Sequence, residues 1–282
     1  MKTPIAITCY NRVDTLKQTL ESLKENYGKR EVHFFCDGYV HQQQLEVFEV
    51  WKYLDDFDYE GSNYFIHKSD EHLGLKKNTF AAIDSMLYNW EYDKFILLQD
   101  DMEFSKDFLQ FMDWALENYK EDHRIMFVSG HSHIELKTDI LYTNNFISEG
   151  LGIWKRKFPH DYELPSDNRL WDFAERTSEF FASILRKAIR GQIESPMMFL
   201  NYAMTTRYHT CLHPGKNKLR HLVTDSQNCK AKDAEILNRN LSEGWDKTSM
   251  NLLIGMNEPV RELHKRKWYK KITRILSEMY GK

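Results

Sequence analysis

The first 130 residues alternate between two hydrophobic periods, and this rhythm limits the fold more than any other feature of the sequence. Short runs of β-branched and other apolar residues are separated by amphipathic segments at helical spacing. The expected strands cover residues 5–8, 32–36, 64–68, 95–99 and 125–129, and three of the expected helices cover residues 42–55, 78–90 and 105–119. The first expected helix has an apolar stripe from Leu16 to Tyr27, with Asn11 and Asp14 in its first turn. Strands and helices that alternate in this way predict a Rossmann-like α/β fold, with a mostly parallel sheet covered by helices on both faces.

Polar or glycine-bearing residues follow the first four expected strands. They are the segment 9–12, Asp37 with Gly38, the segment 69–77, and Asp100 with Asp101. In an open α/β sheet, ligands bind outside the carboxyl ends of the strands, so we expect the binding site at this edge. Arg12 and Lys76 are candidate partners for phosphate groups, although solvated surface charges are the alternative. Asp37 is a candidate acceptor for a base or ribose, and an ordinary Asp-Gly turn is its alternative.

Two adjacent acids, Asp100 and Asp101, end a buried apolar strand. Like charges in a low-dielectric setting repel and raise each other's pKa, so a positive group is expected beside them. Mg²⁺ or Mn²⁺ prefers carboxylate oxygen and commonly bridges to substrate phosphates. The alternative is that the acids only favour the start of the helix that follows Ser105.

The composition, the N-terminal sequence and the cysteine spacing indicate which partners and which compartment to expect. A formal net charge of −3 lacks the basic excess of proteins dedicated to nucleic acid, so we expect no nucleic-acid partner. The N-terminus has no apolar stretch long enough for a signal peptide, and no window is apolar enough to span a membrane. We therefore expect a cytoplasmic protein. The cysteines lack metal-binding or disulfide spacing and are expected to be reduced thiols.

The strand and helix rhythm weakens after Gly130, which predicts a second, smaller subdomain over residues 131–225. The glycine-bearing stretch 150–154 is expected to be a loop. The histidines of this region show no paired metal-binding spacing, so polar surface or core roles are expected rather than zinc binding. These histidines include His131, His133, His213 and His221. The stretch 214–229 is either a loop that closes over a ligand or a plain basic loop.

Residues 226–282 are expected to form a C-terminal helical segment that is basic and amphipathic. Between Arg261 and Arg274 there are seven Lys or Arg residues and one Glu, and Trp268 and Ile272 share one helical stripe. Such a helix suits an anionic membrane surface, which would make the protein peripheral at the inner leaflet. Docking of the apolar stripe on the protein itself is an equal alternative.

Four segments, in order, resemble the nucleotide-sugar-binding half of GT-A glycosyltransferases. They are PIAITCYNRVDTLKQTLESL, FFCDGY, DEHLGLKKNTFAAID and FILLQDDMEFSKDFLQFM. The likeness is to bacterial family-2-like enzymes of capsule and lipopolysaccharide synthesis and to the N-acetylglucosaminyltransferase I type. It covers residues 1 to about 130, and SEGLGIWKRKF extends it to about 158. The resemblance implies a GT-A fold in which residues 1–130 bind a nucleotide sugar and residues 131–225 bind the acceptor.

The resemblance also implies roles for individual positions. The Glu-Asp-Asp metal motif falls on residues 99–101, so Asp101 would bind Mn²⁺ or Mg²⁺, and Asp100 would hold the ribose or a metal-bound water. Two positions depart from the family pattern, because Gln99 replaces an acid and His72 stands where Asn is common. The remaining donor-binding positions implied are Thr8, Tyr10, Asn11, Arg12, Asp37, Gly74 and Lys76.

An inverting transferase needs a general base that takes the proton of the acceptor hydroxyl. In the N-acetylglucosaminyltransferase I type, a Gly-Leu-Gly-Trp segment is followed by an aspartate beside tryptophans, and here GLGIW is followed by RLWDFAE. This resemblance makes Asp172 the candidate base, with Glu149 and Asp161 behind it. A helix-surface role is the alternative for Asp172.

Together these features predict a metal-dependent glycosyltransferase that moves a hexosyl or N-acetylhexosaminyl group, with inversion, from a nucleoside diphosphate donor. UDP-sugars are the default donors from the resemblance, and the expected acceptor is a saccharide or lipid-linked saccharide in bacterial surface polysaccharide synthesis. A nucleotidyltransferase is one alternative, although residues 9–12 lack the glycine-rich phosphate loop that it predicts. A catalytically inactive sugar-binding or scaffold protein is another, because Gln99 replaces an acid.

Overall fold

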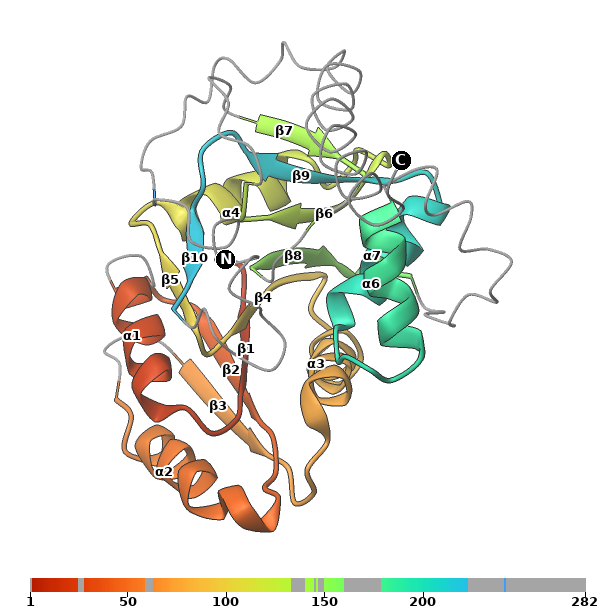
Figure 1. Ribbon diagram of the computed structural model, residues 1–282. Helices are drawn as coiled ribbons and strands as arrows, with labels where there is room; N and C mark the ends of the chain where they lie inside the picture. Colours follow the sequence, from red (N-terminus) through yellow and green to blue (C-terminus); the bar gives the residue numbers. More distant parts are fainter. Residues whose placement is uncertain are drawn as a thin grey trace.

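An eight-stranded sheet is the centre of the computed structural model, which describes residues 2–24, 28–58, 63–132, 140–144, 146, 150–159, 179–222 and 241 (Figure 1). The strand order is β3-β2-β1-β4-β8-β6-β9-β7. The strands are β1 (Ile5–Cys9), β2 (Glu31–Cys36), β3 (Asn63–Lys68), β4 (Lys94–Gln99), β6 (Ile125–Ser129), β7 (Ile140–Thr143), β8 (Leu151–Trp154) and β9 (Thr210–Pro214). The pairs β3-β2, β2-β1, β1-β4 and β6-β9 are parallel, whereas β8 and β7 run antiparallel to their neighbours. The prediction of a mostly parallel α/β sheet is confirmed.

Helices cover both faces of the sheet because its buried strands carry apolar side chains on both sides. One face packs on α1 (Val13–Lys24), α2 (Gln44–Asp55) and α4 (Phe108–Asn118), and the other on α3 (Gly74–Asp84) and α7 (Pro196–Thr206). The alternation is visible along β4, where Ile96 and Leu98 belong to the first core and Phe95 and Leu97 to the second. The helix α6 (Glu179–Ile189) packs against α7, on the side of the sheet away from α1 and α2 (Figure 1).

Short elements complete the described fold. They are the 3-10 turns η1 (His41–Gln43) and η3 (Lys155–Lys157), the π-helical turn η2 (Ser85–Asn89) that extends α3, and a second sheet of β5 (Met102–Phe104) with β10 (Leu219–His221). Within the described residues, no helix is long and apolar enough to cross a membrane.

The expected loop at residues 150–154 is wrong, since Leu151–Trp154 forms β8 and pairs with both β4 and β6. Two glycines in five residues suggested a loop, but Gly152 serves close packing, because a Cβ there would lie 2.9 Å from Leu116 Cδ2. The sheet therefore continues past residue 130 through β8, β9 and β7. The division into donor, acceptor and C-terminal parts stays a prediction.

Candidate functional site

The first four strands end level with one another and place their following loops at one edge of the sheet. In the parallel register Cys9 lies opposite Cys36, Cys36 opposite Lys68, and Thr8 opposite Gln99. The polar segments after these strands therefore meet at the edge where the sequence predicts the ligand. The candidate site is built from these loops and from the end of β10.

Asp100 and Asp101 are buried at the end of β4, with 3% and 7% of their surface exposed. Arg12 contacts both, with Nη2 3.5 Å from Asp100 Oδ1 and Nη1 3.0 Å from Asp101 Oδ2. The backbone N–H of Tyr10 donates to Asp100 Oδ2 at 3.0 Å. The positive group expected beside the acid pair is thus present within the chain, and it comes from the loop after β1.

The two acids differ in their electrostatic surroundings. Burial raises the pKa of Asp100 to about 6, and the charge of Asp101 adds to this effect while Arg12 opposes it. Burial also opposes ionisation of Asp101, but His221 and Arg12 together outweigh it and lower the pKa of Asp101. Asp101 is therefore the acid held most firmly in its charged form.

The small β5-β10 sheet brings His221 to the acid pair. His221 lies opposite Met102 in this sheet, and the backbone N–H of Leu222 donates to Asp101 O at 2.8 Å. The His221 Nδ1 atom lies 3.8 Å from Asp101 Oδ1. Sequence reasoning assigned His221 a polar surface or core role and missed this position. The local signal was weak, because the pairing joins segments more than a hundred residues apart and β10 has only three residues.

The residues at this point fit a divalent cation. Asp101 Oδ1 is buried and has no hydrogen-bond partner, so one carboxylate lone pair is left for a ligand. A carboxylate oxygen beside an imidazole nitrogen is a donor set that Mn²⁺ accepts. Among the residues that the structure describes, no three His, Cys, Asp or Glu side chains form a complete metal site. The other ligands of such an ion would come from water and a bound substrate, as is usual for Mg²⁺-type sites.

Gln99 does not join the acid pair. It is two residues beyond Leu97, so it lies on the α3 and α7 face of β4, and its Nε2 is buried without a hydrogen-bond partner.

Thr8 is 5% exposed and donates through Oγ1 to Leu98 O at 3.4 Å. Asn11 is partly exposed in the loop after β1. The donor-binding roles of Thr8 and Asn11 stay predictions.

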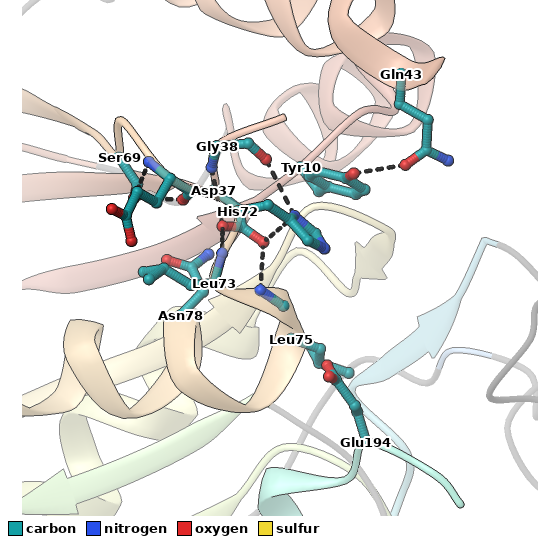
Figure 2. A network of polar contacts seen from close by, with 12 residues as sticks. Tyr10, Asp37, Gly38, Gln43, Ser69, His72, Leu73, Leu75, Asn78 and Glu194 are labelled. Carbon is teal, nitrogen blue, oxygen red and sulfur yellow. Dashed lines mark hydrogen bonds and ion pairs between the residues drawn. The ribbon is translucent and has the colours of Figure 1, made fainter. Parts of the chain in front are cut away.

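Asp37 organises the loop between β3 and α3 (Figure 2). Its Oδ1 accepts from the backbone N–H groups of Gly38 (2.8 Å) and Leu73 (2.6 Å), and its Oδ2 accepts from Gly74 N–H (2.9 Å) and lies 3.1 Å from His72 Nδ1. Leu73 is the N-cap residue of α3 and has no side-chain cap, so Asp37 supplies the acceptors from across the sheet edge. These contacts occupy the carboxylate, so an acceptor role toward a base or ribose would require some of them to open.

An aromatic pair borders the same loop. The rings of Tyr10 and His72 have centroids 5.0 Å apart with planes at 36°, and Tyr10 Oη donates to Gln43 Oε1 at 2.5 Å. Figure 2 shows this pair beside Asp37. The His72 side chain is 34% exposed, so this edge can offer a face for stacking to a flat ligand such as a nucleobase.

Gly74 and Lys76 contact the segment before α7. Gly74 has a φ of +78°, and a Cβ there would lie 2.8 Å from Glu194 Oε1. The backbone N–H of Lys76 donates to Glu194 Oε2 at 3.3 Å, and Lys76 Nζ lies 4.2 Å from the centre of the Phe199 ring. In this structure Lys76 is thus engaged with α7. Asp172, Glu149 and Asp161, the candidate bases, lie outside the described residues.

The fold and the site define a Rossmann-like α/β protein with a buried acid pair, an arginine and a histidine at the carboxyl edge of its sheet. No protein-family profile and no curated protein matches the sequence. Similar solved structures include S. aureus TarS (TM-score 0.46, 13% identity, 80% of this chain and 38% of that chain) and TarS 1-349 (0.43, 13%, 73% and 71%). The glycosyltransferase GlyE of Streptococcus pneumoniae TIGR4 is another (TM-score 0.37, 13% identity, 74% of this chain and 45% of that chain). Likeness at this level assigns no activity to the chain, which spans only 38% of the first of these proteins.

Proposed function

We propose that the chain is a metal-dependent glycosyltransferase of the GT-A type that uses a nucleoside diphosphate sugar as donor. One observation carries the proposal: Asp101 is buried, one of its oxygens contacts Arg12, and the other has no hydrogen-bond partner and lies 3.8 Å from His221. The motif resemblance of residues 1 to about 130 supports the same assignment. A divalent cation would balance the negative charge of the acids at this edge, and a diphosphate would bind the cation.

Each residue of the site has a proposed role that follows from its position. Asp101 and His221 would hold Mn²⁺ or Mg²⁺, which when bound supplies charge stabilisation to the departing diphosphate. Arg12 would contact phosphate oxygens. Tyr10 and His72 would stack on the base, and Asp100 would fix the loop after β1 through the Tyr10 N–H while facing the ribose or a metal-bound water.

The chemical step is a substitution at the anomeric carbon. The acceptor hydroxyl oxygen forms the new bond to this carbon while the bond to the diphosphate oxygen breaks, and the hydroxyl proton passes to a carboxylate. Asp172 is the proposed base, with Glu149 next. We propose a UDP-sugar donor, a hexosyl or N-acetylhexosaminyl group, inversion at the anomeric carbon, and a saccharide or lipid-linked acceptor in bacterial surface polysaccharide synthesis. The proposed location is cytoplasmic, and the basic segment 261–274 would contact the inner leaflet.

A thermal-shift screen with nucleoside diphosphates and Mn²⁺, followed by hydrolysis assays with a panel of nucleotide sugars, tests the proposal. We expect stabilisation by metal plus nucleotide and release of a nucleoside diphosphate from at least one donor. Release of inorganic pyrophosphate from a nucleoside triphosphate would instead identify a nucleotidyltransferase. Binding of a sugar without turnover of any donor would favour the inactive sugar-binding protein.

Two isosteric variants sharpen this experiment. Asp101→Asn removes the charge beside His221, and we expect it to reduce turnover by roughly a hundredfold or more. Glu103→Gln is the matched control, because it removes one negative charge two residues away, where Glu103 pairs with Arg220. Equal turnover in the wild type and Asp101→Asn would remove the cation from the mechanism.

A further inference from the structure

Arg12 holds an unusual position, since one guanidinium contacts both acids of the pair. The Arg12 side chain is 37% exposed, whereas the Asp100 and Asp101 side chains are 5% and 10% exposed. The acids are fixed by the backbone, through Tyr10 N–H to Asp100 and through Leu222 N–H to the Asp101 carbonyl. The arginine is therefore the most exposed side chain of the three, and its guanidinium is not fixed by the backbone contacts that hold the acids.

Arg12 weakens the attraction of this edge for a divalent cation that binds alone. Two carboxylates against one guanidinium leave one net negative charge, and Gln99 adds none where the related motif has an acid. A cation at Asp101 Oδ1 would also lie close to Arg12, whose Nη1 is 3.0 Å from the other oxygen of the same carboxylate. Like charges this close repel strongly at a partly buried site.

A diphosphate would reverse this balance. Its oxygens can accept a bidentate contact from the arginine, which matches phosphate geometry at least as well as carboxylate geometry. Turning of Arg12 to the phosphate would release the Asp101 carboxylate to the cation, and the cation would in turn bind the diphosphate. Each ligand would then raise the affinity for the other, as linkage requires.

We propose that Arg12 makes cation binding conditional on the diphosphate. It acts as the counter-ion of Asp100 and Asp101 in the ligand-free protein and weakens the binding of a divalent ion until a diphosphate draws the guanidinium away. This inference rests on the proposed function for the identity of the anion. If Arg12 had a purely structural role, replacing it would disturb the acid pair. The binding of the cation and of the anion would then both become weaker.

The test measures Mn²⁺ binding to the full chain by the electron paramagnetic resonance signal of free Mn²⁺, without anion and with UDP or inorganic pyrophosphate. Arg12→Gln should bind Mn²⁺ alone on the order of tenfold more tightly than the wild type, and most of the coupling between Mn²⁺ and the anion should be lost. Arg12→Lys, which keeps the charge, should stay near the wild type for Mn²⁺ alone. Arg220→Gln is the matched control, since Arg220 pairs with Glu103 on the neighbouring strand and should leave both affinities unchanged.

Weaker or unchanged Mn²⁺ binding by folded Arg12→Gln, or coupling equal to that of the wild type, would overturn the proposal. Circular dichroism and thermal unfolding establish that the variant is folded. The pyrophosphate arm separates this inference from the proposed function. If no nucleoside diphosphate binds, the glycosyltransferase proposal fails. Coupling between Mn²⁺ and pyrophosphate that depends on Arg12 would still support the counter-ion role of Arg12. If pyrophosphate and Mn²⁺ show no such coupling, the counter-ion role is refuted.

Discussion

His33, in β2, gives the sharpest test of the electrostatics of this fold. The side chain is 0% exposed, its Nδ1 lies 3.1 Å from His67 Nε2, and its Nε2 lies 3.0 Å from Tyr92 Oη. Tyr92 donates its hydroxyl proton to Glu31, so it accepts from His33 Nε2–H, and His33 Nδ1 is left to accept from His67. Phe65 stacks on the ring at 4.7 Å. A second proton on His33 would therefore face a donor in an apolar setting.

Burial, with a smaller contribution from His67, lowers the pKa of His33 from 6.5 to about 4. Because the folded-state pKa is depressed, the unfolded chain binds more protons between these two values, and the free energy of unfolding falls as the pH falls through that range. Linkage with these values gives a loss of about 2 kcal/mol between pH 8 and pH 5, at about 1.4 kcal/mol per pKa unit.

Urea unfolding of the wild type and His33→Asn at both pH values measures this loss. The variant will be less stable at every pH, but its free energy of unfolding should fall by about 2 kcal/mol less than that of the wild type. His41→Asn, at an exposed position in η1, is the control and should follow the wild type. Equal pH dependence in the wild type and His33→Asn, or a His33 ring that titrates near 6.5 by nuclear magnetic resonance, would refute the reasoning.

Two further predictions concern the start of α3. Gly74→Ala should lower the free energy of unfolding by roughly 1–3 kcal/mol in urea, because φ is +78° and the new Cβ would lie 2.8 Å from Glu194 Oε1. Adding Glu194→Ala to Gly74→Ala should restore only the part of the free energy of unfolding that is lost through contact of the new Cβ with Glu194. Full restoration would exclude backbone strain at residue 74. Asp37→Asn replaces an acceptor by a donor, so the amides of Leu73 and Gly74 should exchange hydrogen faster. Unchanged protection would contradict the capping role of Asp37.

Much of the fold was predictable because the signals are local. Short apolar runs locate the first four strands, helical spacing of apolar residues locates the helices between them, and the position at the carboxyl end of a strand locates Asp100 and Asp101. The register then explains why Arg12 is near the acids, since β1 and β4 are neighbours.

The parts that sequence reasoning missed depend on distant pairing. His221 reaches Asp101 only because three residues of β10 pair with β5, and neither strand has a periodic pattern long enough to recognise. The prediction of a loop at β8 is wrong because Gly150 and Gly152 are typical turn residues, whereas here Gly152 makes room for Leu116. The occupied carboxylate of Asp37 was also unforeseen, since its partners come from the β3-α3 loop.

The place of β8 in the sheet bears on how the chain is made. It lies between β4 and β6, although both of these precede it in the sequence. A nascent chain that has left the ribosome only as far as residue 150 thus has strands for both halves of the sheet but not the strand that joins them. Until Leu151–Trp154 emerges, β4 and β6 present open hydrogen-bonding edges, and β6 keeps one open edge until β9 follows, so other chains could pair with these strands during translation.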